Sequence, residues 1–112
     1  MSKQITLLKI RHTKFGLTLA FLLTALGSSA SYAADPIKGG RAYVTQCSSC
    51  HGASGTSMMP GAPNFARGER MMQPDELLLN SIKAGKNAMP AYRGILSDTD
   101  ILDVIAYLRT LH

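Results

Sequence analysis

Apolar residues recur at helical spacing near the C-terminal end of the chain. A spacing of i, i+3, i+4 and i+7 puts side chains on one face of a helix; the residues that follow it are Ile101, Val104, Ile105 and Leu108. Ser97 precedes this run, and its hydroxyl can cap the amide three residues further on. Aspartates near the predicted start suit the positive end of a helix. The pattern predicts an amphipathic helix that begins at Ser97.

A second helix is predicted from Pro74 to Ala84. Proline is favoured at the first position of a helix, where a missing amide hydrogen leaves no bond unmade. Gly85 suits the left-handed conformation just past the helix end. The residues expected on its buried face are Leu77, Leu78 and Ile82.

An earlier helix is predicted to start at Pro36, with Asp35 as its cap, and to run through Tyr43 and Val44. The segment from Gly52 to Met72 is rich in Gly, Pro and Ser and is not expected to form one regular element. No segment alternates as a strand does. The predicted fold class is therefore all-α, with three main helices.

The first thirty-three residues have a different character. A basic head precedes a twelve-residue, mostly apolar run from Phe15 to Leu26, which is shorter than the roughly 20 apolar residues of a membrane span. Small residues at positions 31 and 33 follow. This pattern predicts a secretory signal peptide over 1–33, cleaved after Ala33, and one domain over 34–112. A cut after Ala30 and an uncleaved N-terminal anchor are the alternatives.

The segment Cys47-Ser48-Ser49-Cys50-His51 carries the most specific chemistry in the chain. Its C-x-x-C-H spacing is that of covalent c-type haem attachment. Each thiol can bond to one vinyl group of the porphyrin, and a neutral imidazole is a strong proximal ligand for the iron. We therefore expect one covalently attached haem c, with Cys47 and Cys50 as thioether anchors and His51 as the first axial ligand.

Other uses of a Cys-x-x-Cys pair fit less well. A structural zinc site needs four ligands, and outside the predicted signal the candidates fall short, being Cys47, Cys50, His51 and the terminal His112. A thioredoxin-type redox pair would require alternating strands and helices. A structural disulfide would close a very small loop and leave the adjacent histidine unexplained.

The net charge gives no support for a nucleic-acid partner. The chain has 12 basic and 7 acidic residues, but the basic head of the predicted signal, Lys3, Lys9, Arg11 and Lys14, contains four of the basic ones. The predicted mature chain therefore has a formal charge of only +1. Two haem propionates would bring the holoprotein close to neutrality, so nucleic-acid binding is excluded.

The second axial ligand must come from a different part of the chain. Met89 lies between two predicted helices, and Pro90 stiffens its segment, so it can reach the haem face opposite His51. The remaining candidates are Met71 and Met72, followed by Met58 and Met59. Ordinary core packing is the alternative role for each methionine.

From Gly39 to Leu111 the chain resembles the small class I c-type cytochromes. The order and spacing of several motifs carry the resemblance. They are Gly39, Tyr43 and Cys47 at four-residue steps, the segment Ala62-Pro63-Asn64-Phe65, the segment Lys86-Asn87-Ala88-Met89-Pro90-Ala91-Tyr92, and a C-terminal helix over 101–111. Ala62 stands where the family usually has glycine.

The resemblance implies a cytochrome c fold, in which three main helices wrap around one haem. It implies that Met89 is the sixth iron ligand and that the carbonyl group of Pro63 accepts a hydrogen bond from His51. It also implies that Gly39 lets the C-terminal helix cross closely, with Tyr107 packing towards that glycine.

The function implied is that of a periplasmic one-electron carrier and not of an enzyme. We expect a monomer without stable membrane association after signal cleavage, which docks transiently with redox proteins at the exposed haem edge. Lys83, Lys86 and Arg93 can rim that edge. The alternatives are a haem c subunit dedicated to a periplasmic oxidoreductase, of dehydrogenase or nitrite-reductase type, and a five-coordinate haem enzyme or sensor.

Overall fold

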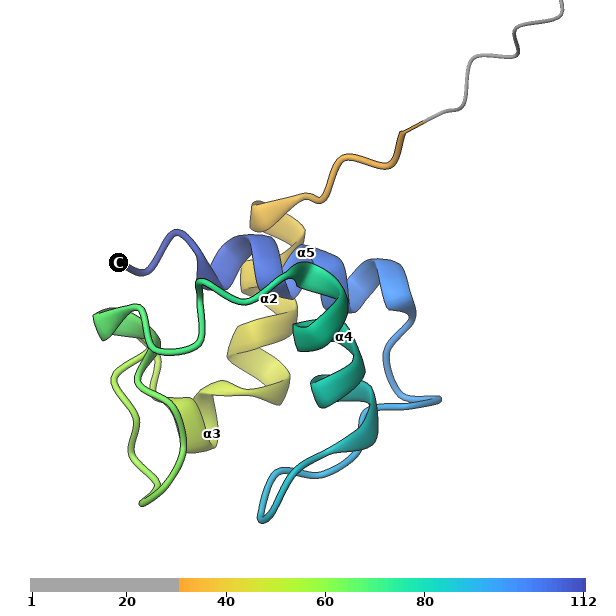
Figure 1. Ribbon diagram of the computed structural model, residues 1–112. Helices are drawn as coiled ribbons and strands as arrows, with labels where there is room; N and C mark the ends of the chain where they lie inside the picture. The colour runs from red at the N-terminus through yellow and green to blue at the C-terminus, as the bar shows by residue number, and fades with distance from the viewer. Residues whose placement is uncertain (1–30) are drawn as a thin grey trace, which may run out of the picture. The chain divides into compact units, whose positions relative to one another are not determined.

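In the part of the chain that the structure describes, helices pack against one another without a sheet. The computed structural model describes residues 31–112, within which Ala33–His112 forms a compact unit. The elements, in order, are α2 (Pro36–Gln46), α3 (Ser48–His51), the short 3₁₀ helix η1 (Phe65–Arg67), α4 (Asp75–Ala84) and α5 (Asp98–Leu108) (Figure 1). Residues 31–112 contain two isolated β-bridges but no strand. The all-α prediction is confirmed, and the predicted signal peptide lies almost wholly outside the described residues.

The helix starts follow the capping chemistry of the sequence. The Asp35 carboxylate accepts from the amides of Ile37 and Lys38 at 2.8 and 3.2 Å, and the Ser97 hydroxyl accepts from the Asp100 amide at 3.1 Å. Both caps match the prediction. Pro74 is itself the cap of α4, so that helix begins one residue later than predicted.

The contact between α2 and α5 is close because α2 carries glycine where the two helices cross. A Cβ placed on Gly39 would lie 1.9 Å from the carbonyl oxygen of Asp103, which no side chain could tolerate. The implied close crossing is therefore confirmed. The implied position of Tyr107 is wrong by one residue, because its ring lies 3.0 Å from a Cβ placed on Gly40. Asp103 fills the place opposite Gly39, and the Tyr107 ring lies 5.2 Å from that of Tyr43.

The core is built from α2, η1, α4, α5 and the loop before α4. Its buried members are Tyr43, Phe65, Met71, Leu78, Ile101, Val104, Ile105 and Leu108. The predicted apolar face of α5 is thus buried. On α4 the prediction is wrong for Leu77, which is 57% exposed, because this side chain faces the cavity described below and not the α5 interface.

Ion pairs link α2 to α5 and α5 to α4. Lys38 on α2 lies 2.8 Å from Asp100 and 3.2 Å from Asp103 on α5. The buried Asp103 carboxylate also accepts from the backbone amide of Asp35 at 2.7 Å. Arg109, at the end of α5, pairs with Asp75 at the start of α4. In the part of the chain described, no helix is long and apolar enough to cross a membrane.

Candidate functional site

The two cysteines and His51 are brought to one side of a single helical turn. α2 ends at Gln46, and Cys47, with φ near −121°, lies between α2 and α3. The Cys47 carbonyl then accepts from the His51 amide at 3.0 Å. α3 is one turn long, and Cys47 is its N-terminal cap. Cys47, Cys50 and His51 all line the same cavity.

The His51 ring is fixed from two directions. Its Nδ1 atom lies 3.4 Å from the Pro63 carbonyl oxygen, so a proton on Nδ1 can be donated there. The ring also stacks on Phe65, with 4.6 Å between centroids. Burial lowers the pKa of His51, against the opposing effect of the Pro63 carbonyl. A neutral imidazole whose Nδ1 donates to a carbonyl has Nε2 free as an electron-pair donor, which is the form that ligates metals.

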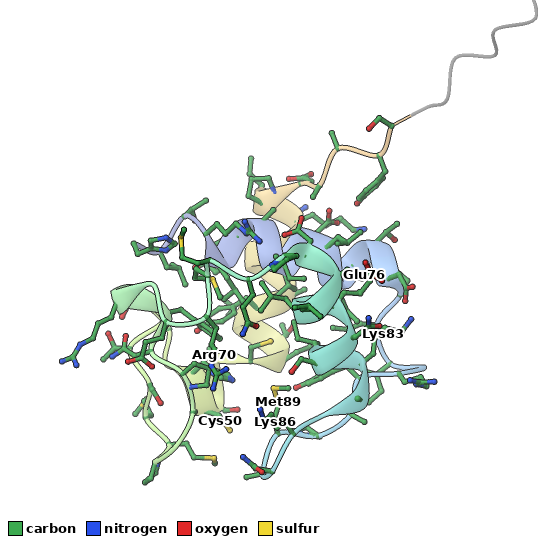
Figure 2. All side chains as sticks on the ribbon, in the orientation of Figure 1. Cys50, Arg70, Glu76, Lys83, Lys86 and Met89 are labelled. Atoms are coloured by element: carbon green, nitrogen blue, oxygen red, sulfur yellow. The ribbon has the colours of Figure 1, made fainter. Side chains whose placement is uncertain are left out.

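Met89 lies in a tight turn after α4. Its amide donates to the Lys86 carbonyl at 2.9 Å, and the Lys86 amide donates to the Met89 carbonyl at 3.1 Å. Asn87 has a φ of 54°, a conformation that asparagine tolerates better than most residues. This turn places Met89 on the cavity wall. Figure 2 shows Met89 and Cys50 on facing sides of the space between α3 and the segment after α4.

The cavity that these residues share has a volume of about 460 Å³. That is within the roughly 300–1,000 Å³ of small-molecule and cofactor sites. Apolar side chains from the core and from α4 form much of its wall, including Leu77, Ile82 and Leu108. A flat apolar macrocycle with iron at its centre requires such a wall, two thiols and axial donors, and this structure provides all of them. The residues fit a haem.

The rival methionines have different surroundings. Met72 is 95% exposed and Met58 is 75% exposed, and neither lines the cavity. Met59 lines the cavity rim at 37% exposure. Met71 lines the cavity but is 3% exposed and belongs to the core cluster. Two cavity-lining methionines, Met59 and Met89, lie outside the core cluster and outside the helices. Met59 follows His51 by only eight residues, so the chain would have to cross the haem edge almost at once to bring it to the opposite face, whereas Met89 reaches the cavity from a separate segment.

The Cys47 thiol is poorly suited to disulfide exchange. Both cysteines are free. Burial, with repulsion from Cys50 as the second cause, raises the pKa of the Cys47 thiol to about 11. Thiol exchange requires a thiolate, which such a pKa makes scarce at neutral pH. Among residues 31–112 there is also no group of three or more His, Cys, Asp or Glu that could hold a metal ion without haem.

Sequence reasoning gave too little weight to two aromatic residues. Tyr92 was part of a motif but had no role of its own; it is buried and donates its hydroxyl to the Gln46 carbonyl at 2.6 Å. Phe65 stacks on His51. A signal for Phe65 was available, because it is a large apolar residue in a loop rich in small and polar ones.

The basic residues expected around the site divide into two kinds. Lys86 lines the cavity. Lys83 is instead paired with Asp98 at 2.6 Å, and Arg93, an exposed residue, does not line the cavity. Arg70, which the sequence did not single out, lines the cavity as well.

Comparisons with known proteins show which family the chain resembles. Residues 34–108 match the family model described as cytochrome C oxidase, cbb3-type, subunit III. A cytochrome c6 from Gracilaria tenuistipitata var. liui is 38% identical, covering 70% of this chain and 74% of the relative. A cytochrome c6 from a Nostoc species is 33% identical, covering 78% and 80%.

A solved structure points in the same direction. The cytochrome c6 of the diatom Phaeodactylum tricornutum superposes with a TM-score of 0.56 and 28% identity. The match covers 68% of this chain and 92% of the diatom protein.

Proposed function

The chain belongs to the small monohaem class I c-type cytochromes, and on that premise we propose that it carries single electrons through a haem c held by His51 and Met89. Cys47 and Cys50 are the proposed thioether anchors, and Pro63 is the proposed acceptor for His51 Nδ1. One observation carries the proposal above all others. Both thiols, the imidazole and the Met89 thioether line the same 460 Å³ cavity.

The chain's residues define what this centre does. When bound, the haem supplies an iron that gains and loses one electron. His51 and Met89 would hold the iron and leave no open coordination site for a substrate, and the thioether donor would favour the ferrous state. The apolar wall excludes water, and the Pro63 and Phe65 contacts hold the His51 ring in place. The protein is therefore an electron carrier and not an enzyme.

The comparisons favour a carrier over a dedicated subunit. The cytochrome c6 relatives are matched over 74% and 80% of their own lengths. We propose a monomer that meets its redox partners briefly at the cavity mouth, where Ala88 and Pro90 are exposed. Weak redox encounters characteristically use small interfaces.

Export to the periplasm is also part of the proposal. The signal over residues 1–33 would be removed after Ala33, leaving residues 34–112 as the mature domain. In support, residues 33–35 are exposed and lie outside any helix, so the chain is accessible where the cut is proposed. The intact mass of the exported protein tests this. One haem added to a chain that starts at Ala34 is expected, whereas a chain that starts at Ser31 selects the alternative cut.

A reversible redox titration of the exported protein tests the function. The expected result is a one-electron transition of a haem that stays attached after denaturation. In the same preparation we expect fast electron exchange with a redox protein and negligible peroxide turnover. Substantial peroxide turnover, with an iron that binds cyanide freely, would contradict the carrier function.

A further inference from the structure

One peptide group links the His51 ring to a carboxylate. The peptide bond between Pro63 and Asn64 has its carbonyl group on Pro63 and its amide hydrogen on Asn64. The carbonyl oxygen lies 3.4 Å from His51 Nδ1, and the amide donates to the Glu69 carboxylate at 2.8 Å. Both hydrogen bonds are therefore made by the same planar, conjugated group. The imidazole, the peptide group and the carboxylate form one hydrogen-bonded chain.

The local backbone brings Glu69 back to Asn64. The helix η1 is a single turn, and Gly68 ends it in the left-handed conformation, with a φ of 73°. Directly after this reversal, the Glu69 amide donates to the Asn64 carbonyl oxygen at 3.2 Å. Glu69 therefore holds Asn64 twice, through its backbone amide and through its side chain. The carboxylate contact is thus part of a closed loop and does not depend on an exposed side chain alone.

Among residues 31–112, no cation forms an ion pair with Glu69. Every ion pair there uses another carboxylate, on α4 or α5. Glu69 is exposed and does not line the cavity. Solvent screens the long-range field of an exposed charge, whereas a direct hydrogen bond to a charged acceptor is roughly twice as strong as a neutral one. The bond to the Asn64 amide is therefore the route by which this charge acts on His51.

We propose that Glu69 is a positioning residue that acts on His51 through the peptide group between Pro63 and Asn64 and lowers the reduction potential of the iron. The inference rests on the proposed ligation of haem by His51. Hydrogen bonds in series polarise one another, so the carboxylate makes the Pro63 carbonyl oxygen a stronger acceptor for the Nδ1 proton. An imidazole whose Nδ1 proton is held more strongly is a more basic ligand at Nε2. Such a ligand stabilises ferric iron more than ferrous iron.

Three variants separate the charge of Glu69 from its shape and from net charge. Glu69→Gln keeps the side-chain length and an acceptor oxygen for the Asn64 amide but removes the negative charge. Glu69→Ala removes the acceptor as well. Glu76→Gln is the matched control, because it removes the same formal charge from an exposed glutamate that does not line the cavity. Figure 2 shows Glu76 on a different part of the molecule from Cys50 and Met89.

The experiment is a redox titration of the haem-loaded wild type and the three variants at pH 7, with the His51 Nδ1 proton followed by NMR in the ferrous state. We expect Glu69→Gln to raise the equilibrium constant for reduction by about twofold to fivefold, which is about 20–40 mV for one electron. Its Nδ1 proton should resonate at lower chemical shift, because the hydrogen bond to Pro63 weakens. Glu69→Ala should shift both quantities at least as far, and Glu76→Gln should match the wild type in both.

The Glu69 inference fails if Glu69→Gln keeps the wild-type potential, because Glu69 would then only close the loop. It also fails if Glu69→Gln and Glu76→Gln shift the potential equally, which is the result expected from net charge alone. An Nδ1 proton that does not move in either Glu69 variant would likewise overturn it. A wild type without covalent haem, or with a His51 ring that does not bind the iron, would instead overturn the proposed function, so the two failures are distinguishable.

Discussion

Tyr92 donates its hydroxyl proton to the carbonyl oxygen of Gln46 at 2.6 Å. Gln46 is the last residue of α2 and directly precedes Cys47, whereas Tyr92 follows Met89 by three residues. A single hydrogen bond thus joins the segment of the proposed sixth ligand to the segment of the proposed haem anchor. These segments are 46 residues apart in sequence.

This bond leads to a prediction about Met89. Tyr92→Phe removes the hydroxyl and keeps the ring, so it should weaken the attachment of the Met89 segment by about 1 kcal/mol, as for one hydrogen bond. Covalent haem should be retained. In a denaturant titration, the far-red absorption band of methionine-ligated ferric haem should be lost at a lower midpoint than in the wild type.

Tyr107→Phe is the control for this experiment. The Tyr107 ring packs against that of Tyr43 at a tilt of 50°, but its hydroxyl makes no hydrogen bond in the described structure. Its midpoint should equal that of the wild type. Equal midpoints for all three proteins would show that the Tyr92 hydroxyl does not hold Met89.

A second prediction concerns the crossing of α2 and α5. Gly39→Ala places a methyl group 1.9 Å from the Asp103 carbonyl oxygen, so the helices must separate. We expect a loss of about 1–3 kcal/mol in the free energy of unfolding, as for other overpacked sites. Chemical denaturation followed by circular dichroism measures it.

Gly40→Ala is a graded comparison in the same helix. Its methyl group would meet the Tyr107 ring at 3.0 Å, and that ring can move more easily than backbone. Alanine also favours a helix by roughly 1 kcal/mol over glycine. The Gly40 variant should therefore be clearly more stable than the Gly39 variant, and the reverse order would contradict the packing described for the crossing.

A third prediction concerns low pH. Hydrogen bonds from Lys38, followed by those from Ser97, lower the pKa of Asp100 from its ordinary 3.8 to about 2. Between these values the unfolded chain binds more protons than the folded one, so stability falls as the pH falls. The contribution of this carboxylate is complete above about pH 4 and is lost as the pH approaches 2.

Lys38→Gln removes the main cause of that shift. Unfolding experiments at several pH values from 5 to 2 should therefore give a shallower decline for this variant than for the wild type. Lys86→Gln, which removes a lysine without an ion pair in the described structure, should keep the wild-type slope. A Lys38 variant with the wild-type slope would show that Asp100 is not the responsible carboxylate.

A fourth prediction separates Met89 from the other methionines. Met89→Ala should keep the covalent haem, lower the reduction potential and allow small ligands such as carbon monoxide to bind. Met72→Ala is the control, since Met72 is 95% exposed and does not line the cavity. If Met89→Ala behaved like the wild type, Met71 would become the preferred ligand, because it also lines the cavity.

Much of this fold was predictable because its signals are local. The Asp35 and Ser97 caps, the proline at the start of α2 and the apolar spacing along α5 each depend on a few neighbouring residues. The haem motif is equally local. For the caps and the apolar face of α5, the structure has the geometry that the sequence spacing predicts.

The remaining features depend on contacts between distant segments. Tyr107 faces Gly40 and not Gly39 because the helix crossing fixes which turn of α2 the ring meets. Leu77 is exposed to the cavity although its spacing placed it with Leu78. The position of Arg70 depends on a left-handed turn that nothing in the sequence around it signals. These three positions depend on tertiary packing, which local sequence patterns do not specify.

The absorption spectrum of the exported wild-type protein in both oxidation states tests the central claim most directly. A haem held by His51 and Met89 should give sharp low-spin bands when reduced and the weak far-red band when oxidised. A covalent haem that is high-spin in both states and lacks the far-red band would contradict the proposed ligation.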